Sequence, residues 1–200
     1  HAVSGGQITP ENYLITAPVA DVRSKPQKPQ LNYQHDELEE TQLLFNEPVL
    51  VYEKTNNWLR IDATEQVEFT HYKKWQGYPG WIEANTAKPI KTIPQFDLII
   101  STKIATVYGP DLRPLMELSI GTKLQKIPNP AKADLKNVDL KKHTAVKLNY
   151  LNEPVGFIPP NSFLRADWRK QQKSAAAIRH KLIQTAELFF GDPYYWGGRA

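Results

Sequence analysis

Trp58-Leu59-Arg60-Ile61, followed by Gly80-Trp81-Ile82, is the stretch of sequence from which the fold can be predicted. Apolar and polar side chains alternate in its first part, which is typical of a strand with one buried face. A similar pair occurs later, where Ala145-Val146-Lys147-Leu148 is followed by Gly156-Phe157-Ile158. We therefore expect two β-rich modules built on one plan.

Short β-rich runs separated by turn residues extend from Tyr13 to about Phe163. The chain has 16 prolines and 10 glycines, and this excess of proline argues against long helices over most of its length. Short strands at such spacing favour small barrels or sandwiches. The expected strands are 13–15, 20–22, 48–53, 58–61, 80–83, 103–107, 122–127, 144–148 and 156–158.

Each expected module begins with a similar strand, Ala20-Asp21-Val22-Arg23 in the first and Ala105-Thr106-Val107-Tyr108 in the second. A long loop, a turn and further strands follow in both. Thr92-Ile93-Pro94-Gln95 is the expected joint, because proline interrupts a continuous strand there.

One amphipathic helix is expected near the C-terminal end. Ser174 can cap its start, and Gly191-Asp192-Pro193 is a strong stop signal. Apolar residues recur between them at helical spacing, at Ile178, Leu182, Ile183, Ala186 and Phe189 or Phe190.

The composition is that of a globular protein. The 200 residues are 40% hydrophobic, with a mean hydropathy of −0.52 and a net charge of +4 from 25 basic and 21 acidic side chains. No run of apolar residues is long enough to span a membrane. The mild positive charge suits an anionic polymer, but the scattered Lys and Arg make nucleic acid a poor partner. We expect one basic cluster to be a solvated face: Arg165, Arg169, Lys170, Lys173, Arg179 and Lys181.

The residue types present limit the chemistry of these 200 residues. They contain no cysteine, which excludes disulfides, thiolate metal sites and a cysteine nucleophile among them. No serine nucleophile elbow or paired-carboxylate motif takes its place. His35, His71, His143 and His180 lack the spacing of metal ligands, so neither a metal nor another cofactor is expected. The start, 1–7, carries no hydrophobic signal region and looks processed.

Pro193-Tyr194-Tyr195-Trp196-Gly197-Gly198-Arg199, coming after a helix, is similar to the opening of the NlpC-type papain-like cysteine peptidases. The resemblance implies that an Asp-Cys-Ser-Gly nucleophile motif and a catalytic His follow Ala200, so that this stretch alone lacks peptidase activity. It also implies that Tyr194 and Trp196 line the active site. The alternative is that the aromatic residues are only a packed turn.

Three upstream stretches resemble bacterial SH3-like domains, in particular the first such domain of γ-D-glutamyl-L-diamino acid endopeptidases. They are Ala20-Asp21-Val22-Arg23-Ser24, the segment 40–49, and Gly77-Tyr78-Pro79-Gly80-Trp81-Ile82. Asn46 stands where that family usually has glycine, a mild change because Asn tolerates left-handed backbone angles.

The resemblance implies a mainly β protein with two small SH3-like β-barrels, then a linker helix and the start of an α+β papain-like domain. The expected limits are 1–15 for an N-terminal segment, 16–92 and 93–165 for the SH3-like domains, and 166–200 for the rest.

In that endopeptidase family the first SH3-like domain recognises the free amino terminus of the peptide. Carried over, the resemblance implies that Tyr78 and Glu40, with Glu39 possible, bind a terminal ammonium. A carboxylate and a phenol oxygen suit that charge, and an acylated amine would leave the carboxylate unpaired. The bland alternatives are turn packing for Tyr78 and a solvated acidic face for Glu40.

The implied partner is a peptidoglycan stem peptide, cleaved between γ-D-Glu and the L-diamino acid. The alternative function is a non-catalytic tandem module that binds the cell wall. The segment 69–75 is expected to be an insertion near the cleft. A cleaved export signal would place the protein in the periplasm or wall, and a recycling role would place it in the cytoplasm. The sequence does not reveal the oligomeric state.

Overall fold

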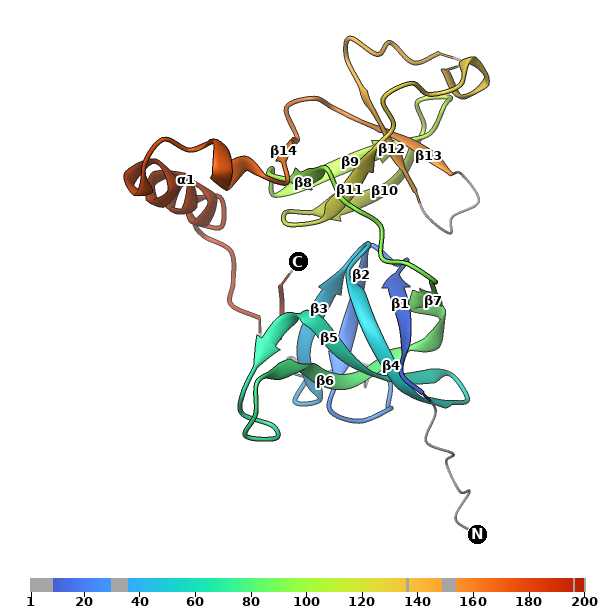
Figure 1. The fold of residues 1–200 in the computed structure, drawn as a ribbon, viewed down its shortest axis with the longest axis vertical. Coiled ribbons are helices and arrows are strands. Elements are labelled where there is room, and N and C mark those ends of the chain that lie inside the picture. The colour runs from blue at the N-terminus through green and yellow to red at the C-terminus, as the bar shows by residue number, and fades with distance from the viewer. Residues whose placement is uncertain (1–8, 30–35, 136, 149–153, 196, 200) are drawn as a thin grey trace. The chain divides into compact units, whose positions relative to one another are not determined.

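The computed structural model describes residues 9–29, 36–135, 137–148, 154–195 and 197–199 (Figure 1). Its contacts divide the chain into two compact units. The first unit runs to Ile93 and takes in the segment from Tyr194 onward, and the second is Pro94–Pro193. The segment after Pro193 therefore belongs with strands that precede it by more than a hundred residues.

The first unit is one antiparallel sheet in the order β3-β2-β6-β5-β4-β1-β7 (Figure 1). The edge strands β3 and β7 are not paired with each other in the described residues, so the sheet is not a closed barrel. Its strands are β1 (Glu11–Ile15), β2 (Val19–Arg23), β3 (Glu39–Leu44), β4 (Pro48–Thr55), β5 (Trp58–Glu68), β6 (Gln76–Glu83) and β7 (Ala87–Pro89). A 3-10 turn, Ala84–Thr86, joins the last two.

The second unit is also a seven-stranded antiparallel sheet, in the order β10-β9-β13-β12-β11-β8-β14. Its strands are β8 (Leu98–Ile100), β9 (Ile104–Tyr108), β10 (Pro114–Ser119), β11 (Lys123–Lys126), β12 (Thr144–Lys147), β13 (Val155–Ile158) and β14 (Phe163–Arg165). Two 3-10 turns, η2 (Lys132–Leu135) and η3 (Trp168–Gln171), and one helix complete this unit. The chain is therefore mainly β, as predicted.

The core of the first unit follows from the alternation of side chains along its strands. In β5, Leu59 and Ile61 are buried while Arg60 between them is exposed, because successive side chains point to opposite faces. Tyr78 packs against this core at its margin, and Trp58 and Trp81 are half-buried.

All nine expected strands overlap strands of the structure, and five further strands were not expected. One of these is β3, which begins Glu39-Glu40-Thr41-Gln42 and lacks the apolar alternation that predicts a strand. It forms because its backbone pairs with β2, from Val19↔Leu44 to Arg23↔Glu39. This strand carries the candidate site.

The expected helix is present as α1 (Ala175–Glu187). The Ser174 hydroxyl accepts a hydrogen bond from the backbone N–H of Ala177 at 3.2 Å, as a capping residue does. None of its residues is buried, and the apolar Leu182 and Ile183 are 48% and 57% exposed. Neither this helix nor any other in the described ranges is long and apolar enough to cross a membrane.

The repeated glycine of the two modules has the same physical cause in both. A Cβ atom on Gly80 would lie 2.4 Å from Cγ1 of Val22, and one on Gly156 would lie 2.5 Å from Cγ1 of Val107. In each unit a valine side chain therefore occupies the space that any larger residue would need.

We predict that Gly80→Ala and Gly156→Ala each lower the free energy of unfolding by about 1–3 kcal/mol, because the added methyl overpacks the core. Urea unfolding of each variant measures this. Gly109→Ala is the control, since its Cβ would meet the movable carboxylate of Asp111 at 3.2 Å. Equal stability of all three variants would refute the explanation.

Candidate functional site

The candidate site lies at the start of β3, where the strand carries two consecutive carboxylates. Val22 pairs with Thr41 and Arg23 with Glu39, so Glu40 is an extra residue that forms a β-bulge. A bulge bends a strand and redirects its side chains, and bulges are common beside functional sites. The bulge thus gives Glu40 a direction that a regular strand would not.

Glu40 forms a hydrogen bond with Tyr78, as the resemblance implied that the two would lie together. The Tyr78 hydroxyl donates to Oε2 of Glu40 at 2.8 Å, from the position opposite Ala63 in the β5–β6 ladder. Burial raises the pKa of Tyr78, and the hydrogen bond and charge of Glu40 raise it further. The phenol therefore stays protonated at neutral pH. Both side chains are half-buried, so the pair is within reach of a ligand.

The hairpin between β5 and β6 supports Tyr78 from another side. The His71 ring contacts the Tyr78 ring edge-on, with centroids 5.0 Å apart and planes at 69°. Glu68 accepts hydrogen bonds from the Thr70 hydroxyl, the His71 backbone and the Gln76 side chain. Burial acts to raise the pKa of Glu68, but these bonds outweigh it and lower the pKa to about 2. The hairpin is therefore held in one shape beside the Glu40–Tyr78 pair.

Glu39 is enclosed, unlike its neighbour. It is 3% exposed, and its Oε1 has no hydrogen-bond partner among the described residues. Its Oε2 lies 3.4 Å from the hydroxyl of Tyr195. Burial, with the charge of Asp21 as the next cause, raises the pKa of Glu39 to about 7. The charge of Glu39 is therefore sensitive to pH near neutrality. Glu40 is the more accessible carboxylate, because it is only half-buried.

The segment from Tyr194 to Arg199 covers Glu39. The backbone N–H of Arg199 donates to Oε1 of Gln42 at 2.8 Å, and its guanidinium Nη1 lies 2.7 and 2.9 Å from the two carboxylate oxygens of Glu47. Gly197 has a positive φ of 71°, and a Cβ there would lie 2.9 Å from Cγ of Glu39. Only glycine fits this approach without strain.

The structure places the remaining site residues as follows. Tyr194 is 85% exposed, and Trp196 lies outside the described residues, so the roles expected for them stay predictions. Tyr195 contacts the buried carboxylate, although no sequence pattern favours it over Tyr194. Arg199 was not expected to take part either, since its partner Glu47 is 152 residues away in the chain.

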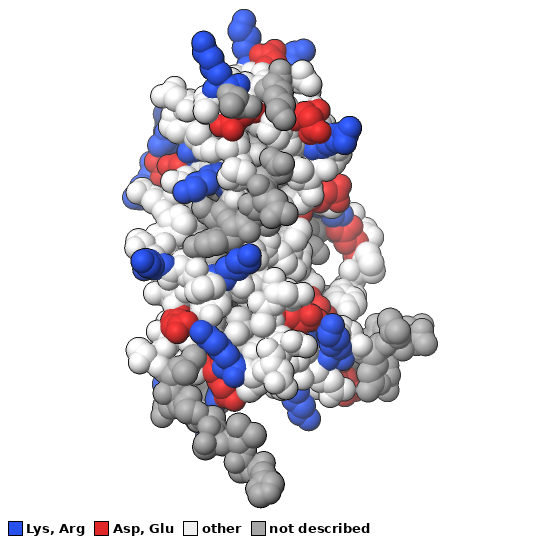
Figure 2. All heavy atoms as spheres, turned by 90° about the vertical axis from the view of Figure 1, so that its right-hand side faces the viewer, with Lys and Arg blue, Asp and Glu red and all other residues white. Residues whose placement is uncertain are grey.

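The face drawn in Figure 2 has no broad patch of one charge sign. Lys and Arg are interspersed with Asp and Glu on the face drawn in Figure 2. Among the residues that the structure describes, no three His, Asp or Glu side chains are grouped so as to hold a metal ion. The site on β3 is therefore distinguished by its hydrogen-bonded pairs, Glu40 with Tyr78 and Glu39 with Tyr195, and not by an extended patch of charge.

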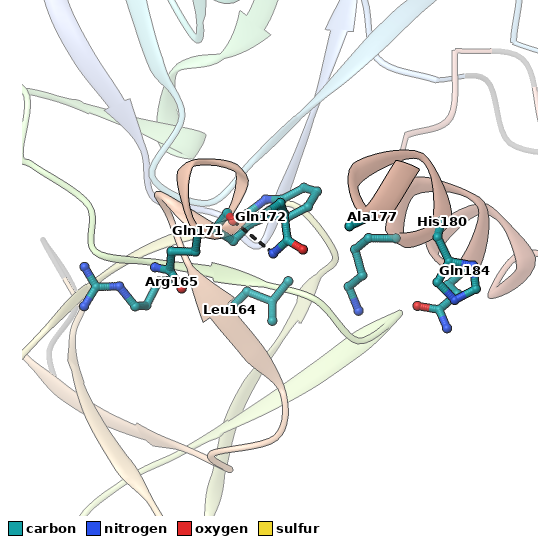
Figure 3. Close-up of a pocket in the computed structure, with 9 residues that line it drawn as sticks. Leu164, Arg165, Gln171, Gln172, Ala177, His180 and Gln184 are labelled. Atoms are coloured by element: carbon teal, nitrogen blue, oxygen red, sulfur yellow. Dashed lines mark hydrogen bonds between the residues drawn. The ribbon is translucent and has the colours of Figure 1, made fainter. Parts of the chain in front are cut away.

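A hollow of about 390 Å³ lies in the second unit, between η3 and α1 (Figure 3). Its lining includes Trp168, His180, Lys181 and Gln184, and the side chain of Gln172 donates to the Trp168 carbonyl at 3.2 Å. Arg165 extends away from α1 in Figure 3 and pairs with Asp167. The lining contains no carboxylate, so this hollow cannot neutralise a cationic ligand as β3 can.

The raised pKa of Glu39 predicts how stability depends on pH. Between pH 4.5, its ordinary pKa, and about 7 the folded protein holds a proton that the unfolded chain has lost, so the free energy of unfolding falls as pH rises through this window. Glu39→Gln removes this loss. At pH 8 we expect the variant to be about 1–3 kcal/mol more stable than the wild type, with little difference at pH 4.

Urea unfolding at several pH values tests this prediction. Glu37→Gln is the matched control, because Glu37 is an exposed carboxylate close in sequence. A difference between wild type and Glu39→Gln that is the same at pH 4 and pH 8 would show that the burial of Glu39 has no electrostatic cost.

The sequence was compared with known protein families and with individual proteins. No model of a known protein family matches the sequence. The chain is 31% identical over 166 residues to a gamma-D-glutamyl-L-lysine dipeptidyl-peptidase from Bacillus subtilis (strain 168), which covers 82% of the chain and 48% of that protein. The chain thus spans about half the length of this curated relative.

A solved structure gives the corresponding likeness in fold. An NlpC/P60 family protein from Bacillus cereus ATCC 10987 superposes with a TM-score of 0.69 at 19% identity, over 94% of this chain and 66% of that one. The chain is therefore similar in sequence to a gamma-D-glutamyl-L-lysine dipeptidyl-peptidase and similar in fold to an NlpC/P60 family protein.

Proposed function

We propose that the protein carrying this chain is an NlpC-type peptidase of peptidoglycan stem peptides, and that it hydrolyses the bond between γ-D-Glu and the L-diamino acid. In this proposal both units are SH3-like modules, and the first one binds the free amino terminus of the substrate. The observation that carries the proposal is the hydrogen-bonded pair of Glu40 and Tyr78 on a β-bulge, in a chain similar to a gamma-D-glutamyl-L-lysine dipeptidyl-peptidase.

The pair has the chemistry to hold a primary ammonium group. Glu40 supplies a negative charge, and its Oε1 has no hydrogen bond among the described residues. The Tyr78 hydroxyl donates its one hydrogen bond to Glu40, which leaves the phenol oxygen able to accept a hydrogen bond from the ligand. Charge-assisted hydrogen bonds of this kind are stronger than neutral ones, and partial burial strengthens them further.

The same pair selects against a blocked amino terminus. An N-acylated peptide has lost the ammonium charge and most of its donors, so binding would leave the charge of the half-buried Glu40 without an opposite charge. Sites built around a buried polar group reject ligands that cannot satisfy it. The preferred substrate is therefore a stem peptide already released from the glycan strand.

The peptide bond itself is cleaved by residues outside this stretch, which contains no cysteine. In the proposed reaction a cysteine thiolate supplied beyond Ala200 attacks the carbonyl carbon of the γ-D-Glu side chain. The diamino acid leaves as an amine after receiving a proton from a histidine, and water then hydrolyses the thioester. The role of this chain is to place the peptide by its amino terminus.

The test compares L-Ala-γ-D-Glu-L-Lys with its N-acetyl form as substrates of the full-length protein. The wild type should cleave the free amine far faster, and Glu40→Gln and Tyr78→Phe should each reduce this preference in kcat/KM by about 10-fold or more. Tyr72→Phe is the control, because Tyr72 is an exposed tyrosine of the adjacent hairpin. Absence of cleavage, or equal rates on the two substrates, would refute the proposal.

A second candidate function is binding of the wall polymer, and one specific feature favours it. The β5–β6 hairpin exposes Phe69, Tyr72 and Trp75 at 46%, 52% and 74%, and the first and last of these rings lie 5.5 Å apart. Exposed aromatic clusters on a rigid loop commonly mark interaction surfaces.

Co-sedimentation with purified, peptide-free glycan strands separates the two functions. If wall binding is the function, the wild type sediments with the glycan and Trp75→Ala does not, while Glu40→Gln has no effect. If the wild type does not sediment with the glycan strands, wall binding is excluded as the function.

A further inference from the structure

We propose that Arg199 is a positioning residue for the ammonium site: by tying the segment 194–199 to β3, it keeps Tyr195 and Gly197 closed over Glu39. This inference rests on the proposed function, because Glu39 directly precedes the carboxylate that we assign to ligand binding. The hydrogen bonds of Arg199 go to Gln42 and Glu47, and not to Glu40 or Tyr78.

Glu47, the ionic partner of Arg199, is buried. The Glu47 side chain is only 6% exposed, while that of Arg199 is 38% exposed. Burial raises the pKa of Glu47, and the charge and hydrogen bonds of Arg199 act against that rise. A buried carboxylate that lost its cation would be left uncompensated, which is costly. The pair therefore holds the segment more firmly than an ion pair on the surface would.

Gln42 fixes the register of the segment on β3. Gln42 accepts the backbone N–H of Arg199 with its side chain, and its amide nitrogen donates to Asp21 in β2 at 3.1 Å. The backbone carbonyl of Gln42 accepts from Gln66 in β5 at 2.9 Å. Hydrogen bonds to β2 and β5 thus fix Gln42 independently of Arg199. An anchor at this residue sets where the preceding Gly197 meets the strand.

The anchored segment encloses Glu39. Gly197 lies against Glu39, and the Tyr195 hydroxyl donates to its Oε2 at 3.4 Å, so both residues belong to the anchored segment. Burial is the largest cause of the raised pKa of Glu39. Release of the segment would let water reach Glu39 and would also remove the Tyr195 hydrogen bond, which lowers the pKa. Because burial is the larger of these two effects, the pKa of Glu39 should fall toward 4.5.

The consequence for specificity follows from the local dielectric. Excluding water from Glu39 lowers the effective dielectric constant around the adjacent Glu40. Charge interactions are stronger where the dielectric constant is lower. Release of the segment would let water compete for the ammonium group. Selectivity for a free amino terminus should therefore depend on Arg199, although the residue does not contact the peptide.

The experiment uses the full-length protein and three variants of the ion pair. Arg199→Met removes the cation, and Arg199→Lys keeps a charge that can still reach Glu47. The double variant Glu47→Gln/Arg199→Met releases the segment without leaving a buried charge, which guards against a variant that fails to fold. Arg113→Met is the matched control, because the Arg113 side chain is 86% exposed and forms an ion pair with Asp111.

Two readouts are measured on each protein. The first is the pKa of Glu39 from carboxyl ¹³C NMR, with its signal assigned by its loss in Glu39→Gln. The second is the ratio of kcat/KM for L-Ala-γ-D-Glu-L-Lys to that for its N-acetyl form. In Arg199→Met and in the double variant we expect the pKa to fall from about 7 toward 4.5 and the ratio to fall about 10-fold. Arg199→Lys should recover most of both values, and Arg113→Met should change neither.

The outcomes separate this inference from the proposed function. If the wild type prefers the free amine and the double variant keeps both that preference and the raised pKa of Glu39, Arg199 does not position the site and the inference is overturned. If the wild type shows no preference, the proposed function fails, and the assignment of Arg199 to an ammonium site falls with it.

Discussion

The hydrogen bond from Tyr78 to Glu40 is the interaction on which the site depends. It joins β6, inside the first sheet, to the edge strand β3, and it reaches Glu40 because a bulge has turned that residue out of the regular ladder. The half-buried phenol keeps its proton, so the carboxylate is held in place without being neutralised. A fixed, charged and accessible acceptor results, which is what recognition of an ammonium group requires.

The two carboxylates at the start of β3 differ in their exposure to solvent. Glu40 remains accessible and is steadied by a tyrosine from its own sheet, whereas Glu39 is enclosed by a segment that returns from the far end of the chain. An edge strand with free backbone groups and buried charge is a weak point of a sheet. The returning segment covers it through Arg199, which contacts both Gln42 and Glu47.

Much of the fold could be predicted from the sequence, because the strands with one buried face reveal themselves by alternation. Leu59 and Ile61 in β5 are examples. The helix cap at Ser174 was also predicted from the sequence. The strand β3 could not be predicted, since its first residues are polar and only pairing with β2 makes them a strand. Closed barrels were expected from a resemblance, but no hydrogen bonds join the edges of the two described sheets.

The candidate site divides in the same way. Glu40 and Tyr78 were reached by resemblance to a family motif, and the structure adds the bond between them. The pairing of Tyr195 with Glu39 and of Arg199 with Glu47 joins residues more than 150 positions apart. No local pattern records such contacts, because they depend on where the chain returns after the second unit.

The most direct test of the central claim is a crystal structure of the full-length protein with the dipeptide L-Ala-γ-D-Glu bound. The account predicts that the ammonium nitrogen lies about 3 Å from a carboxylate oxygen of Glu40 and from the phenol oxygen of Tyr78. A dipeptide bound with its amino group away from β3, for instance against Phe69 and Trp75 of the hairpin, would contradict it.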